Sequence, residues 1–240
     1  LPAVYRVHEK PSADKAANLK AMLAPLGFAL READNGSLQK VLDAARGTPQ
    51  APAIHTMVLR SLMKARYDVQ NLGHFGLAAK YYCHFTSPIR RYPDLMVHRI
   101  LTALLDGTLG EGRSAGALSA AAQRAAVQSS ERELAAMSAE REIEKCYMAE
   151  FMSAHVGETF PGAVSGVTRF GLFVALANGV EGLLPVTALP DDRYEYDEVR
   201  MTLTGSRTKL TYSFGMPLEV LCAAANAGSG QIDFTLPGVE

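Results

Sequence analysis

One stretch organises the first part of the chain: His84-Phe85-Thr86-Ser87-Pro88-Ile89-Arg90-Arg91-Tyr92-Pro93-Asp94-Leu95. The proline at position 88 lacks a backbone donor and disfavours a helical conformation at Ser87, so the sequence predicts a bend there. Pro93 suits the first position of a helix, and Asp94 adds a negative charge at the positive end of the helix dipole. Arg90 and Arg91 are therefore expected on a corner between an extended segment and a helix.

The paired arginines allow two interpretations. Planar guanidinium groups with forked donors suit a phosphate better than lysines do, so Arg90 and Arg91 on a rigid corner would contact phosphoryl oxygens. Alternatively, they are surface or salt-bridged arginines at a helix entry, because exposure is the default for charged side chains. The residue types alone leave both interpretations open.

Residues 84–95 closely resemble a late motif in the nuclease domain of the ribonuclease II / ribonuclease R (RNB) family of 3′-to-5′ exoribonucleases. The resemblance implies that Arg90 is catalytic and stabilises charge on the phosphoryl oxygens in the transition state, with Arg91 positioning the RNA backbone. Residues 137–141 resemble a family segment that in some members places a glutamate at the active site, which makes Glu140 a third catalytic candidate. The alternative for Glu140 is a solvated charge on a helix surface.

Apolar residues at helical spacing predict that the rest of the first part is mostly helical. After a short strand near residues 3–8, the expected helices cover about 12–26, 37–46, 53–66, 93–105 and 117–154. Residues 107–119 are rich in Gly, Ser and Ala and are expected to form a loop. Ser130 and Glu133 have the spacing of a capping box, which would restart or reinforce the last helix.

From residue 156 onward the pattern changes to short runs of β-branched and aromatic residues separated by glycines. Five strands are expected, two paired within 158–176 and the others near 180–186, 218–224 and 231–236. Five short strands in about 80 residues suit an OB-type barrel. The pattern resembles an S1 RNA-binding domain, and the insertion at 190–214 resembles the ribonuclease R branch of the family in particular.

The S1 resemblance implies an RNA-binding face made by Phe170 and Phe173, with Arg169 beside them, because exposed aromatic rings stack on bases in OB folds. The alternative is that one or both phenylalanines belong to the barrel core. Residues 1–156 carry 19 Lys and Arg against 15 Asp and Glu, whereas residues 157–240 carry 5 against 10. We therefore expect this module to bind RNA weakly by itself.

The expected fold is α+β: residues 1–155 form the mostly helical C-terminal part of an RNB nuclease domain, and residues 156–240 form the S1 barrel. The resemblance implies processive hydrolysis of RNA from the 3′ end, releasing nucleoside 5′-monophosphates. Such hydrolysis needs several carboxylates around Mg²⁺, and no Asp-rich run lies near the arginine corner. In the family the metal-binding aspartates precede the residue that corresponds to Leu1, so Mg²⁺ is expected in the intact enzyme, no metal ligand is assigned in this chain, and the chain alone is expected to be inactive.

A second function class stays open, a non-catalytic RNA-binding module built on the S1 domain. The expected partner is single-stranded RNA, with structured RNA as a further candidate, and the expected oligomeric state is a monomer. Three widely spaced cysteines without a C-x-x-C motif favour a reducing, cytoplasmic setting. No apolar run is long enough for a membrane span, so no membrane partner is expected.

Overall fold

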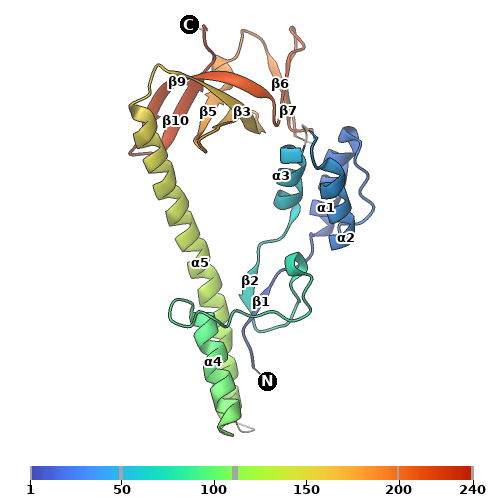
Figure 1. Ribbon diagram of the computed structural model, residues 1–240, viewed down its shortest axis with the longest axis vertical. Coiled ribbons are helices and arrows are strands. Elements are labelled where there is room, and N and C mark those ends of the chain that lie inside the picture. Colours follow the sequence, from blue (N-terminus) through green and yellow to red (C-terminus); the bar gives the residue numbers. More distant parts are fainter. Residues whose placement is uncertain (1, 49–50, 110–112, 199, 239–240) are drawn as a thin grey trace. The chain divides into compact units, whose positions relative to one another are not determined.

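The computed structural model describes residues 2–48, 51–109, 113–198 and 200–238. The chain divides into two compact units. Unit 1 comprises Leu1–Ala44 and Met57–Met137, and unit 2 comprises Ala45–Thr56 and Ser138–Glu240. Unit 1 is mostly helical and unit 2 contains a closed β-barrel, so the expected α+β class is confirmed (Figure 1).

Two short strands lie at the centre of unit 1. Strand β1 (Tyr5–Val7) pairs antiparallel with β2 (Arg66–Asp68), and Arg6 lies opposite Tyr67. β1 was expected from the sequence, but β2 was not. The predicted helix over 53–66 was too long, because α3 (Ala51–Ser61) ends before this strand. Pairing with a strand far away in sequence overrides the local helical pattern at residue 66.

The remaining helices of the first part begin and end close to their predicted positions. In α1 (Ala13–Leu23) the Ser12 side chain accepts a hydrogen bond from the backbone N–H of Lys15 at 3.3 Å, as expected for an N-cap. A 3₁₀ turn, η1 (Ala24–Leu26), follows and ends at Gly27, whose φ of +85° favours glycine. Helix α2 covers Asn35–Ala45, and a second 3₁₀ turn, η2, covers Phe75–Leu77.

Helices α4 (Tyr92–Leu105) and α5 (Arg113–Ser153) pack through small side chains in unit 1. Met96 and Ile100 of α4 share a buried cluster with three alanines of α5, at positions 122, 125 and 126. The expected loop over 107–119 was too long, since α5 already begins at Arg113; residues 110–112 lie outside the described residues.

The predicted capping box at Ser130 was wrong, because Ser130 lies inside the continuous helix α5. Its hydroxyl donates to the carbonyl of Ala126 at 2.9 Å and accepts from the backbone N–H of Tyr67 at 2.9 Å. Ser130 therefore joins β2 to α5, and it caps no helix. A polar pair at capping-box spacing can serve a tertiary contact when the helix runs on through it.

Unit 2 contains the five-stranded barrel that the sequence predicts. Its strands are β3 (Thr159–Thr168), β4 (Gly171–Leu176), β5 (Glu181–Pro185), β9 (Pro217–Asn226) and β10 (Gln231–Thr235), closed in the order β10-β5-β4-β3-β9. The C-terminal end of α5 lies against the barrel, and its Ala149 and Met152 are fully buried in the barrel core (Figure 1).

The segment between β5 and β9 forms a second, three-stranded sheet that was not predicted as strands. After a 3₁₀ turn, η3 (Val186–Ala188), it comprises β6 (Tyr194–Asp197), β7 (Thr202–Gly205) and β8 (Thr211–Ser213). Asp192 fixes its last turn by accepting hydrogen bonds from the backbone N–H groups of Arg207 and Thr208 and from the Thr208 hydroxyl. These bonds lower the pKa of the Asp192 carboxyl well below its ordinary value.

Candidate nucleic-acid interface

The predicted bend at Ser87 and the following proline is present. The carbonyl of Ser87 accepts hydrogen bonds from the backbone N–H groups of Arg90 at 3.3 Å and Arg91 at 3.0 Å, which closes a tight turn. Arg91 is the N-cap residue of α4, and Pro93 lies in the first turn of that helix. The two arginines therefore lie on a corner at the start of α4, which we call the arginine corner (residues 87–94).

The buried Asp94 side chain stabilises the arginine corner by bonding to both Ser87 and Arg91. Its carboxylate is fully buried, and its Oδ2 atom accepts from the backbone N–H of Ser87 at 2.8 Å and from Nη2 of Arg91 at 2.9 Å. Charge-assisted hydrogen bonds of this length are among the strong ones. The helix dipole, which was the expected reason for an acidic residue here, is therefore a minor part of what Asp94 does.

The two arginines differ in what their side chains contact. The Arg91 guanidinium is bound to Asp94 and its side chain is 24% exposed. Arg90 is exposed, and its side chain forms no hydrogen bond or ion pair with any residue that the structure describes. Of the two, Arg90 thus has a guanidinium free to bind an anion, while Arg91 contributes to the shape of the corner.

A polar and aromatic network that the sequence analysis missed lies beside the arginine corner. The Tyr67 hydroxyl and Nδ1 of His84 are 2.9 Å apart, and the Arg6 guanidinium lies 4.7 Å from the centre of the Tyr67 ring. Arg6 in turn makes a two-pronged ion pair with Glu133 of α5, at 2.6 and 3.0 Å. Burial, together with the Arg91 and Arg6 charges, lowers the pKa of His84 below its ordinary value, so His84 is neutral at neutral pH.

Glu140, the third catalytic candidate, is exposed on α5 and has no partner among the described residues. It belongs to unit 2, whereas Arg90 and Arg91 belong to unit 1. The two arginines therefore lie together in unit 1, and Glu140 is not part of that unit.

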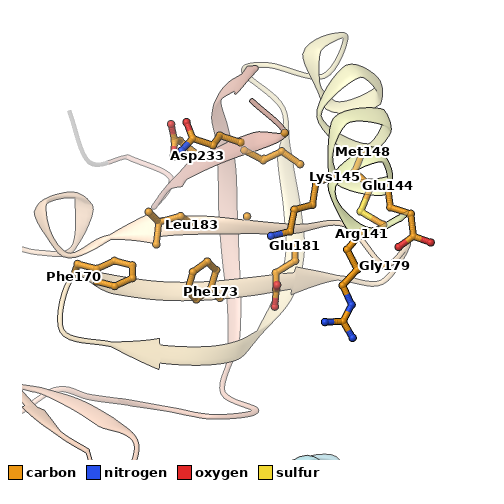
Figure 2. Close-up of a pocket in the computed structure, with 14 residues that line it drawn as sticks. Arg141, Glu144, Lys145, Met148, Phe170, Phe173, Gly179, Glu181, Leu183 and Asp233 are labelled. Atoms are coloured by element: carbon orange, nitrogen blue, oxygen red, sulfur yellow. The ribbon is translucent and has the colours of Figure 1, made fainter. Parts of the chain in front are cut away.

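The aromatic candidates lie together on the surface of the barrel. The rings of Phe170 and Phe173 meet edge to face with centroids 6.2 Å apart, and Phe170 is 53% exposed. Figure 2 shows both rings side by side along β4. Neither ring belongs to the buried core of the barrel, in contrast to the alternative that one or both phenylalanines are core residues. Arg169 is exposed in the turn immediately before Phe170.

A groove of about 510 Å³ runs along this face of unit 2. Its lining combines apolar side chains with charges of both signs, contributed by Arg141, Glu144, Lys145 and Met148 of α5, Phe170 and Phe173, Glu181 and Leu183 of β5, and Asp233 of β10 (Figure 2). The sequence analysis singled out the phenylalanines but not the helix side chains, because the packing of α5 on the barrel cannot be inferred from local patterns.

The described residues contain no group of three or more His, Cys, Asp and Glu side chains arranged to hold a metal ion. The side chains of these described residues therefore do not fit a two-metal hydrolytic centre by themselves.

Within the described ranges, no helix has both the length and the apolar composition that crossing a membrane requires.

Comparison with known proteins agrees with the fold and with the order of its parts. Residues 1–107 match the model of the RNB domain, and residues 153–210 match that of the S1 RNA binding domain. Ribonuclease R 1 of Lactococcus lactis is 43% identical over 98% of this chain, and ribonuclease R of Escherichia coli is 37% identical over the whole chain. The chain spans 29% and 31% of the length of these two relatives.

Solved structures that resemble this chain also include ribonuclease R. RNase R of Mycoplasma genitalium in its apo form superimposes on 98% of this chain with a TM-score of 0.90 and 29% sequence identity, and the match covers 38% of that protein. The same protein has been solved in complex with ribose-methylated single-stranded RNA, with the same TM-score.

Proposed function

We propose that this chain, whose residues 1–107 match the RNB domain and whose residues 153–210 match the S1 RNA binding domain, is the C-terminal part of a 3′-to-5′ exoribonuclease of the ribonuclease R type. The reaction would be processive hydrolysis of RNA from the 3′ end, with release of nucleoside 5′-monophosphates. The division into an RNB part, residues 1–155, and an S1 part, residues 156–240, belongs to this proposal. The observation that carries it is the alignment of nearly the whole chain with ribonuclease R at 43% identity.

The arginine corner would provide electrostatic stabilisation. Arg90 is exposed and unpaired among the described residues, so it would donate to the phosphoryl oxygens as charge develops there. Arg91 would position the backbone, and its bond to the buried Asp94 supports a positioning role. Glu140 is proposed as an active-site glutamate from the family resemblance, and its exposure and lack of a described partner leave it free to contact RNA.

Divalent metal ions belong to this proposal. RNB nucleases are generally dependent on divalent metal ions, and the proposed ion is Mg²⁺, held by carboxylates other than those of the residues that the structure describes. The donor set described above does not form such a centre, so this chain alone is proposed not to hydrolyse RNA.

The proposed partners are single-stranded RNA and structured RNA. RNase R of Mycoplasma genitalium has been solved with both single-stranded and double-stranded RNA. In this chain Phe170, Phe173 and Arg169 would form the S1 contact face, by stacking on bases and by contact with phosphate. We further propose that the protein is a monomer and that it acts in the cytoplasm. The three widely spaced free cysteines support the reducing setting alone.

Steady-state kinetics of Arg90→Ala in the full-length enzyme test the proposal. Loss of one transition-state donor lowers kcat by about 10²-fold or more, with RNA binding little changed. Arg124→Ala is the matched control, because Arg124 is an exposed arginine of α5 outside the corner. If the full-length protein with intact arginines shortens no RNA in the presence of Mg²⁺, the chain belongs instead to a non-catalytic RNA-binding protein.

A further inference from the structure

Two cations on α5 face the groove of unit 2. Arg141 and Lys145 are four residues apart, so they lie one above the other on the same side of the helix. Each has an acidic residue three positions away along the helix, Glu144 for Arg141 and Glu142 for Lys145, but neither cation forms an ion pair with a described residue. Both side chains therefore remain available to bind an anion.

The helix that carries these cations is fixed to the barrel. Ala149 and Met152, on the next turns of α5, are fully buried in the barrel core. Gly230, in the turn between β9 and β10, has a φ of +65°, and a Cβ atom there would lie 2.9 Å from Cβ of Lys145. Because the backbone of this turn touches α5 directly, the helix positions that carry the two cations are held at a fixed distance from the barrel surface.

The opposite side of the groove supplies flat apolar surface. Phe170 and Phe173 line it together with Leu183. Figure 2 shows Lys145 projecting from α5 toward the strands and Arg141 extending past the strand ends near Gly179, while Glu144 points away from the strands. Single-stranded nucleic acids are bound by aromatic rings that stack on the bases and by cations that follow the phosphates. Aromatic rings come from the barrel and the cations from the helix.

The barrel itself is poorly supplied with positive charge. Residues 157–240 carry 5 Lys and Arg against 10 Asp and Glu, and the barrel side of the groove includes Glu181 and Asp233. A barrel with this charge needs cations from elsewhere to hold a polyanion.

We propose that Arg141 and Lys145 bind phosphates of single-stranded RNA whose bases stack on Phe170 and Phe173, so that the RNA site of the S1 domain is shared with the helix before it. This inference rests on the proposed function, because it takes RNA as the ligand. It adds two binding residues outside the S1 barrel and accounts for how an acidic barrel holds RNA.

The test is the salt dependence of RNA binding by the 240-residue chain, measured by fluorescence anisotropy with a labelled single-stranded oligonucleotide. Each phosphate contact to a single strand contributes about 0.7 to the slope of log K against log salt. The double variant Arg141→Ala/Lys145→Ala is expected to lower the magnitude of this slope by about 1.4 and to weaken binding on the order of tenfold at 0.1 M salt. Arg193→Ala/Lys209→Ala removes the same charge from exposed positions of unit 2 outside the groove, and should leave the slope nearly unchanged.

Phe173→Ala separates this inference from the proposed function. It should weaken binding without changing the slope, because stacking releases no counterions. If Phe173→Ala weakens binding while the double variant keeps the wild-type slope, or if the control lowers the slope equally, the shared site is refuted and the proposed function stands. If the unmodified chain binds no RNA at all, the shared site and the RNA-binding part of the proposed function both fail. Helical circular dichroism of each variant checks that α5 remains folded.

Discussion

Replacing Asp94 should open the arginine corner, since this one carboxylate binds both sides of the turn. Asp94→Asn keeps the shape of the side chain but removes the charge that Arg91 contacts at 2.9 Å. Breaking a buried ion pair costs about 3 to 5 kcal/mol. The Arg91 side chain is 24% exposed and gains some hydration when the pair is lost, so we expect about 3 kcal/mol, at the low end of this range.

Native-state hydrogen exchange is the appropriate assay, because it reports on the corner alone in a chain with two units. A loss of about 3 kcal/mol corresponds to roughly 100-fold faster exchange of the Ser87 amide, whose N–H donates to Asp94. Asp106→Asn, at the exposed C-terminal end of α4, is the matched control and should leave this amide unchanged. Ser87 exchange within about threefold of wild type in Asp94→Asn would refute the reasoning.

Three further predictions concern other parts of the chain. The pKa of His84 is lowered in the folded protein, so unit 1 should keep its full stability above the ordinary histidine pKa of 6.5 and lose stability as the pH falls below it. In urea unfolding measured at a series of pH values, His84→Gln should reduce this loss of stability below pH 6.5. Gly230→Ala should destabilise unit 2 by more than about 1 kcal/mol in thermal unfolding, and by more than Gly215→Ala, which has a similar positive φ but open space around its Cβ position. Ser130→Ala should cost about 1 to 2 kcal/mol in urea unfolding, because the N–H of Tyr67 loses its acceptor.

Each of these predictions has a clear contrary result. A pH series that is identical for wild type and His84→Gln would show that His84 does not titrate differently in the folded state. Equal effects of Gly230→Ala and Gly215→Ala would assign the cost to backbone strain and not to the contact with α5. Unchanged unfolding in Ser130→Ala would mean that the Tyr67 amide finds another acceptor.

The barrel and the corner could be predicted because their signals are local. Glycine-separated β-branched runs predicted each barrel strand to within a few residues, and the Ser-Pro bend followed from the conformational limits of proline. β2 could not be predicted in this way: its three residues are stabilised by pairing with Arg6 and its neighbours, about 60 positions earlier in the chain. The same reason hid Ser130, whose hydroxyl contacts Tyr67 across a separation of 63 residues.

At the candidate site, sequence analysis identified candidate residues, but it could not show which of their side chains already bind other residues of the protein. The family resemblance gives Arg90 and Arg91 different roles, but the sequence does not show that Arg91 is bound to the buried Asp94 while Arg90 has no described partner. Likewise, Arg141 and Lys145 look like ordinary surface charges until α5 is seen against the barrel. The roles of Arg90, Arg91, Glu140, Arg169, Phe170 and Phe173 stay predictions until the variants above are measured.

The three-stranded insertion bears on how the barrel folds. Closing the barrel brings β10 beside β5, and the chain between them passes through the whole β6-β7-β8 sheet. Pairing of strands far apart in sequence is slow, because the entropy of closing a long loop must be overcome first. The insertion consists of consecutive antiparallel pairs, which form from neighbouring residues, and its Leu203 and Tyr212 side chains enter the barrel core. Because its strands pair with their neighbours in sequence, the insertion shortens the stretch of chain that must be ordered when β9 pairs with β3 and β10 with β5.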